Sequence, residues 1–157
     1  MSHEQLGHDV EAQRLYEDAI EHQRRARAIQ PEIVVHRTFY TNHLLGLGGM
    51  FLRAGKLDQA ARLADEAASL WTREASPLVS SAILMVGCAG SVGPEDTPGA
   101  KARRNRFGQR AVAILNKAVD GGFRNPSFFR TSSQLDPIRD RDDFKALIAR
   151  LEKTAAK

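Results

Sequence analysis

A spacing of small residues recurs in the first half of the chain with a constant offset. The matching positions are Leu6-Gly7, Ala19 and Ala26 in one segment and Leu47-Gly48, Ala60 and Ala67 in the next. The offset is 41, because 47 − 6, 60 − 19 and 67 − 26 are equal. Glycine and alanine at such positions let two helices approach closely while larger residues fill the space between them. The spacing therefore predicts helical hairpins that stack on one another.

Proline and glycine indicate where these helices begin and end. Pro31 suits the first turn of a long helix that runs to Gly55. Ala111 and Ala118 lie 51 residues beyond Ala60 and Ala67, since 111 − 60 and 118 − 67 both equal 51. They indicate a third, less regular unit. Its expected parts are a helix near 76–90, a Gly- and Pro-rich loop at 91–100, and a helix near 101–120 that ends at Gly121-Gly122.

The last part of the chain is not a repeat. Asn125-Pro126 and Asp136-Pro137 each look like a helix cap followed by a first-turn proline, which predicts short helical turns. The final helix is expected to start with the acids of 140–143. Its apolar stripe is Phe144, Leu147, Ile148 and Leu151. One apolar face and one charged face are what a C-terminal cap of a helical array needs.

The pattern predicts one all-α domain over residues 1–157, because no strand-like alternation appears. A chain of 157 residues can bury a core without disulfide bonds. The predicted divisions are units at about 4–31, 32–74 and 76–121, followed by a cap over 122–157.

The spacing of Leu47-Gly48, Phe51, Gly55, Ala60 and Ala67 resembles the tetratricopeptide repeat family across most of residues 4–120. The tail resembles the segment that closes the repeat arrays of bacterial multidomain serine/threonine protein kinases. The matching residues are Ala111, Val112, Leu115, Ala118, Val119 and Gly122, then Leu135, Pro137, Ile138, Arg139 and Phe144. The tail departs from that pattern at 132–134 and at Asp143. The resemblance implies the C-terminal module of a larger signalling protein, and the chain itself has no kinase catalytic motif.

The family resemblance also implies a binding surface, a concave groove formed by the first helix of each unit. Carried onto this chain, its residues are Asn42, Leu45, Gly49 and Arg53 in the second unit and Ser81, Leu84 and Cys88 in the third. His8 and Glu11 are the candidates in the first unit. This set predicts a protein partner, bound through an apolar or mixed peptide. The alternative is a structural role in which an uncapped first unit stacks on a second copy, giving a homodimer.

Other functions have little support in the sequence. The five histidines are scattered and predict no metal site, and no catalytic set or cofactor site can be assembled from spacing. We therefore expect a protein that is not an enzyme. The basic segment at 101–110 is interpreted as a solvated helix edge, with an acidic peptide or nucleic acid as the alternative. The N-terminus lacks signal-peptide character, and no apolar run is long enough to cross a membrane, which predicts a cytoplasmic protein.

Overall fold

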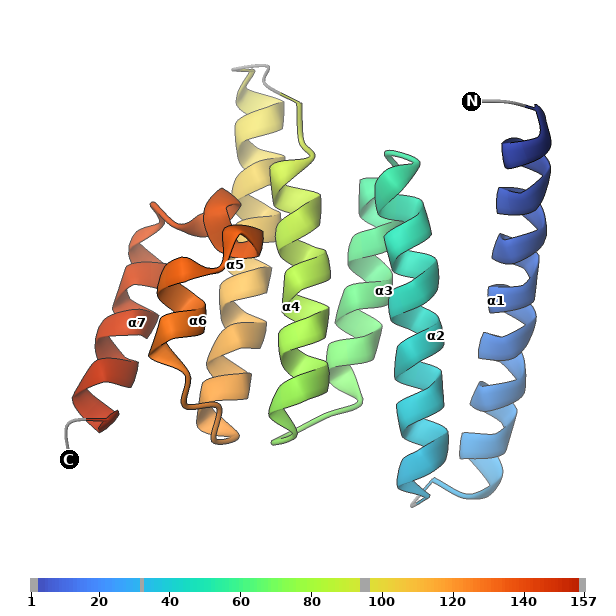
Figure 1. Ribbon diagram of the computed structural model, residues 1–157, viewed down its shortest axis with the longest axis horizontal. Helices are drawn as coiled ribbons and strands as arrows, with labels where there is room; N and C mark the ends of the chain where they lie inside the picture. The colour runs from blue at the N-terminus through green and yellow to red at the C-terminus, as the bar shows by residue number, and fades with distance from the viewer. Residues whose placement is uncertain (1–2, 32, 94–96, 156–157) are drawn as a thin grey trace.

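The computed structural model describes residues 3–31, 33–93 and 97–155, and within them every regular element is a helix. Figure 1 shows the arrangement. The helices are α1 (His3–Ile29), α2 (Val34–Arg53), α3 (Leu57–Ser69), α4 (Ala75–Gly90), α5 (Pro98–Asp120), α6 (Pro126–Thr131), the 3-10 helix η1 (Ser133–Ile138) and α7 (Asp142–Ala155). The all-α prediction is confirmed.

Consecutive helices pack against one another from α1 to α5. α2 also contacts α4, so these two helices lie side by side in one layer, with α3 and α5 behind them in Figure 1. The core runs along the whole row and consists largely of leucine, alanine and phenylalanine side chains. η1 packs on α4, and α7 packs on α5 and α6, which closes the C-terminal end of the row.

The predicted ends of the helices in the second and third units are confirmed, but the start of α2 is not, because α2 begins at Val34, three residues after Pro31. α2 ends at Arg53, followed by Gly55 with a φ of 72°, a conformation that favours glycine. α4 and α5 begin and end within three residues of the predicted positions. Part of the predicted loop at 91–100, residues 94–96, lies outside the described residues.

The prediction of a helix pair in the first unit is wrong. Residues His3–Ile29 form one continuous helix, α1, rather than two helices joined by a turn. Between Gly7 and Pro31 the sequence contains neither glycine nor proline, so nothing interrupts the backbone hydrogen bonds. Ion pairs one turn apart, Arg14 with Asp18 and Glu21 with Arg25, further favour a single helix.

Two glycines let α2 and α4 approach closely. A Cβ on Gly87 of α4 would lie 2.7 Å from Cδ2 of Leu52 on α2. In the opposite direction, Leu84 of α4 occupies the space where a Cβ of Gly48 would be. On each helix, a leucine of the other helix therefore fills the space beside a glycine, which we call a glycine notch. Gly48 and Gly87 therefore allow α2 and α4 to pack closely on one another.

The C-terminal end is closed by aromatic packing and by one arginine. The ring of Phe129 is fully buried, and its centroid lies 5.5–6.1 Å from those of Phe123, Phe128 and Phe144. Arg139 donates hydrogen bonds to the carbonyl oxygens of Phe129, Arg130 and Ser132. The short helix α6 starts as predicted, with Asn125 accepting a hydrogen bond from the backbone N–H of Phe128. Asp136-Pro137 lies inside η1 rather than at a helix start.

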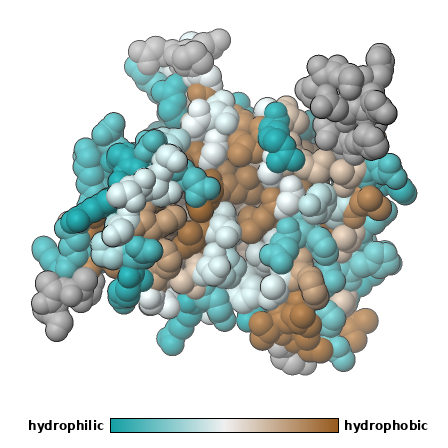
Figure 2. Space-filling model, viewed as in Figure 1, coloured by the Kyte–Doolittle hydropathy of each residue, from teal (hydrophilic) through white to brown (hydrophobic). Residues whose placement is uncertain are grey.

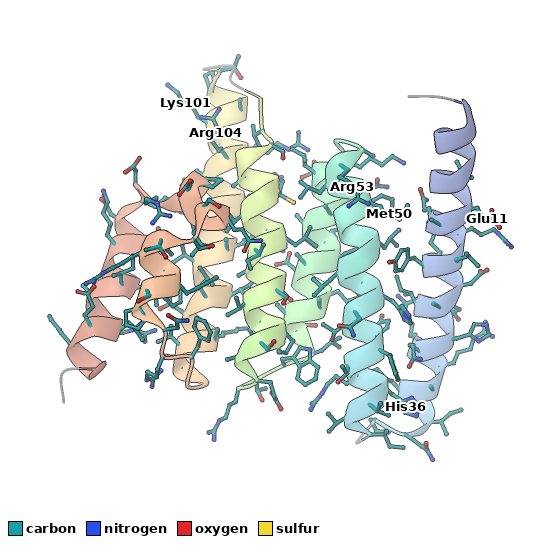
Figure 3. All side chains as sticks on the ribbon, in the orientation of Figure 1. Glu11, His36, Met50, Arg53, Lys101 and Arg104 are labelled. Carbon is teal, nitrogen blue, oxygen red and sulfur yellow. The ribbon has the colours of Figure 1, made fainter. Side chains whose placement is uncertain are left out.

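The N-terminal end is not an uncapped apolar face. The side chains of Glu11, Arg14, Asp18 and Arg25 are exposed along α1, and Figure 3 shows Glu11 on the side of the helix away from α2. Val10 and Leu15 of α1 are exposed as well, so α1 covers α2 with one side and presents both charged and apolar side chains to solvent with the other. Stacking of a second copy on the first unit stays a prediction.

Candidate functional site

A shallow groove runs between α2 and α4 on the face shown in Figure 2. It consists of two adjoining hollows that share Leu45 and Ser80. The upper hollow, of about 360 Å³, is lined by Leu45, Leu52, Ser80, Ile83, Leu84, Gly87 and Gln134. The lower hollow, of about 290 Å³, is lined by Thr38, Thr41, Asn42, Leu45, Trp71, Ser76, Pro77 and Ser80. Together they form one open groove along most of both helices.

The upper hollow is apolar. Leu45 and Leu52 of α2 line one side, and Ile83 of α4 lines the other, all three only partly buried. Figure 2 shows the resulting hydrophobic strip near the centre of the molecule, over α2 and α4. Gln134 of η1 brings an amide to the edge of this hollow. A partner's aliphatic or aromatic side chain would bury apolar area here, with one polar group beside it.

The lower hollow is more polar and contains the single tryptophan of the chain. Trp71 is nearly fully buried, and its Nε1 donates a 2.8 Å hydrogen bond to Oγ1 of Thr41. The guanidinium of Arg37 lies 4.2 Å from the centre of the Trp71 ring and also pairs with Glu74. These contacts fix the ring, so Trp71 is a core residue that also lines the groove.

The groove carries no negative charge of its own. Neither α2 nor α4 contains an aspartate or a glutamate. Arg53 ends α2 at the upper end of the groove, and its Nη1 lies 3.6 Å from where a Cβ of Gly49 would be. Among the described residues it has no ion pair, and Figure 3 shows it at the end of α2. The exposed cation of this surface is therefore Arg53, because Arg37 is paired with Glu74.

The structure places the predicted binding residues of α2 on this face. Asn42 is exposed in the lower hollow, and Leu45 lines both hollows. Gly49 and Arg53 lie on the same side of α2, outside the hollows themselves. The first unit contributes nothing that the structure describes, since the side chain of His8 lies outside the described residues and Glu11 is on the outer side of α1.

The predicted residues of α4 are mostly wrong, because the assignment is rotated by about one residue. Ser81 and Cys88 are fully buried and lie beneath the surface, while Ser80, Ile83 and Gly87 line the groove. Leu84 does line the upper hollow, but most of its side chain fills the notch at Gly48. Burial also raises the pKa of the Cys88 thiol to about 11, so this thiol is neutral at physiological pH.

The one-residue error in the assignment of α4 has a physical cause in the composition of this helix. α4 contains no charged residue, so no polar stripe marks its solvent side. A buried serine is tolerated because Oγ of Ser81 donates to the carbonyl oxygen of Pro77, four residues earlier. The pair Ser76 and Ser80, spaced by one turn and both exposed, was the available signal for the outer face.

The basic segment of α5 is engaged within the molecule. Arg103 and Arg106 both pair with Asp58 of α3, at 2.5 and 2.7 Å. Arg110 pairs with Asp65, and Arg104 donates to the carbonyl oxygen of Gly93. The inner face of this helix is buried, with Phe107, Ala111 and Leu115 in the core. The contacts of Arg103, Arg104, Arg106 and Arg110 hold the basic segment against the rest of the molecule.

Two further searches of the described residues bear on other classes of function. No group of three or more His, Cys, Asp or Glu side chains is placed to hold a metal ion there. Within the same residues, no helix combines the length and apolar character needed to cross a bilayer.

Comparisons with known proteins give no relative. No protein-family model, no curated protein and no solved structure matches this chain.

Proposed function

We propose that this protein is an interaction module that captures a peptide segment of a protein partner in the groove between α2 and α4. The observation that carries the proposal is the continuity of the groove. Two hollows join at Leu45 and Ser80, so an extended or helical segment can lie along both helices. The upper hollow offers apolar area, and the lower one offers hydroxyl and amide groups. Such a combination binds side chains and holds a main chain in place.

The proposed architecture is a tetratricopeptide-like array in which α2–α3 and α4–α5 are the helix pairs. Its support is the order of packing and the close approach of α2 and α4 at Gly48 and Gly87. In such arrays the first helices of the pairs line the binding surface. A place in a larger cytoplasmic signalling protein, next to a kinase domain, remains a prediction. The size of the native polypeptide, detected with an antibody to this chain, tests it.

The groove is tested by selecting peptides from a random dodecamer phage library on the wild-type protein and measuring their affinities by titration calorimetry. Leu45→Glu places a charge in both hollows, and Ser80→Arg fills the groove from an exposed position. We expect each to weaken the selected peptides at least 10-fold, about 1.4 kcal/mol. Circular dichroism checks that both variants remain folded.

Matched substitutions outside the groove serve as controls. Ser69→Arg and Arg62→Glu change exposed residues of α3, which lines neither hollow. Both should bind as the wild type does. Selected peptides that bind all four variants equally would show that the groove is not the binding surface. A selection that yields no specific peptide at all would also count against the proposal.

A second candidate function is self-association through an apolar patch at the bend between α1 and α2. The corner patch consists of Ile29, Val34, Val35 and Phe39, whose exposed fractions range from 49% to 79%. It forms the hydrophobic surface at the lower right of Figure 2. Neighbouring charges are paired, Arg25 with Glu21 and Arg37 with Glu74. A neutral, apolar surface favours a second copy of itself over a charged partner.

The size of the corner patch predicts a weak dimer. Four side chains exposed to this extent present roughly 400 Å², within the ~300–600 Å² range of the largest patch on a monomer. Two copies would bury about 800 Å², less than the ~1,200 Å² of stable complexes. Analytical ultracentrifugation should therefore show a dimer at high protein concentration that Val35→Asp abolishes. A monomer at every concentration would exclude this function.

A further inference from the structure

We propose that the ligand of the groove is an amphipathic segment with an apolar side chain in the upper hollow and an aspartate or glutamate side chain on Arg53. This inference rests on the proposed function and adds the chemistry of the partner. It joins two features that lie close together on α2, the hollow beside Leu52 and the guanidinium of the next residue.

The charge of the groove favours a partner with an acidic side chain. Because α2 and α4 contain no carboxylate, nothing in these helices would repel an acidic side chain. The other arginine at the groove, Arg37, is held by Glu74 and by the ring of Trp71. Arg53, without a described partner, is the group that gains an ion pair on binding. A partner with a lysine at the same place would meet a like charge, which costs affinity and on-rate.

The spacing of the two features sets the pattern expected in the partner. Arg53 lies one turn beyond Gly49, and its Nη1 lies 3.6 Å from where a Cβ of that glycine would be. The guanidinium therefore folds back along the outer face of α2 to the level of Gly49, which lies in sequence between Leu45 and Leu52 of the upper hollow. An acidic side chain and an apolar side chain three or four residues apart lie on the same face of a helix, so a helical partner can present both to this part of α2.

A side-chain carboxylate fits this surface better than a C-terminal one. Recognition of a chain end uses several donors that converge on one carboxylate, and here a single guanidinium is present at the upper end. Apart from Arg53, the two helices contain one lysine or arginine residue, Arg37, which lies near the opposite end of α2. Arg53 can bind one carboxylate bidentately while the main chain continues past it.

Parallel peptide selections on the wild type and on Arg53→Glu test this inference. Leu45→Glu serves as the counter-selection target, so that only peptides dependent on the groove are counted. Selections on the wild type should enrich Asp or Glu three or four residues from Leu, Ile or Phe. The Arg53→Glu variant should enrich Lys or Arg at that position instead. Arg62→Glu, the same charge reversal on α3, should leave the preference acidic.

Synthetic peptides then measure the effect. Replacing the enriched acid by Gln or Asn should weaken binding to the wild type about 5- to 10-fold and leave binding to Arg53→Gln nearly unchanged. Amidating the C-terminus should have no effect, whereas a loss on amidation would mean that a chain end is recognised instead. Groove-dependent peptides without acid preference, or a preference that Arg53→Glu leaves unchanged, would overturn the inference alone. Absence of any groove-dependent peptide would overturn the proposed function as well.

Discussion

The two ends of this molecule are built differently. At the C-terminal end, the large apolar side chains of α6, η1 and α7 are buried or, at Phe128 and Ile148, partly buried against the core, and Arg139 donates to three carbonyl oxygens there. At the N-terminal end, α1 is held mainly by α2. The exposed large hydrophobic side chains of the described residues all lie between Val10 and Phe39.

This difference indicates which part of the molecule is a stabilising closure and which part has surface left for a partner. A buried apolar side chain contributes about 1.5–3 kcal/mol to folding, and an exposed one contributes little. At the C-terminal end, the apolar side chains pack within the folded protein and leave little apolar area exposed. The helices near the N-terminal end, α2 above all, retain apolar area at the groove and at the corner patch. Both proposals of binding rest on this exposed apolar area.

The largest effect is expected from comparing one phenylalanine at each end. Phe129→Ala removes a fully buried ring from a cluster of four and should cost about 3–5 kcal/mol in the free energy of unfolding. Phe39→Ala removes a half-exposed ring and should stay within about 0.5 kcal/mol. Urea unfolding followed by circular dichroism measures both. Equal losses would contradict the distinction between the two ends.

A smaller loss is expected at Arg139. Arg139→Ala removes a donor from the carbonyl oxygens of Phe129, Arg130 and Ser132, of which Ser132 keeps the backbone N–H of Leu135, and should destabilise the protein by about 1–3 kcal/mol. Arg25→Ala, which breaks an exposed pair within α1, should cost less than about 0.5 kcal/mol. Thermal unfolding of the two variants measures which one loses more stability. A greater loss for Arg25→Ala would reverse the comparison.

A local effect is expected at the N-terminal end. A Cβ at Gly46 would lie 2.6 Å from the Tyr16 ring of α1, so Gly46→Ala should push α1 away from α2. Hydrogen exchange followed by mass spectrometry should then speed up in α1 and stay unchanged in α6 and α7. Gly99→Ala, with nothing within 4 Å of its Cβ, is the matched control. Faster exchange in α7 would mean that the two ends are coupled.

The smallest effect is expected at Cys88, which lies in α4 between the two ends. Burial raises the pKa of its thiol from 9.0 to about 11. Because the folded pKa is the higher one, this contribution to stability is complete below pH 9 and is lost as the pH rises toward 11. Cys88→Ala should remove that part of the pH dependence in urea titrations.

In addition, Phe129→Ala should speed alkylation of Cys88 more than Phe39→Ala does.

The sequence predicted the parts of the fold that rest on strong local signals. Gly55 and Gly121 ended α2 and α5 as predicted, and Gly48, one of the small residues of the repeat spacing, lies where α4 packs closely on α2. The first segment was predicted wrongly because small residues at the spacing of a helix pair also occur within a single uninterrupted helix. Only a helix-breaking residue distinguishes a helix pair from a single helix, and the sequence has none between Gly7 and Pro31.

The candidate site was less predictable than the fold. The α2 residues Asn42 and Leu45 line the hollows, but polar and apolar side chains are not separated into two faces on that helix, so only the family resemblance suggested them. α4 has no charged residue, so the exposed position of Ile83 depends on which face its neighbours cover. Gln134 reaches the groove from η1, a contact between distant segments that only the folded chain reveals.

The most direct test of the binding surface is methyl NMR of the protein with a peptide from the library selection. The Leu, Val and Ile methyl groups report on both exposed apolar regions at once. The account predicts that the largest shift changes occur at Leu45, Leu52 and Ile83, with those of Val34 and Val35 unchanged. Shift changes confined to Val34 and Val35 would show that the corner patch, and not the groove between α2 and α4, binds the partner.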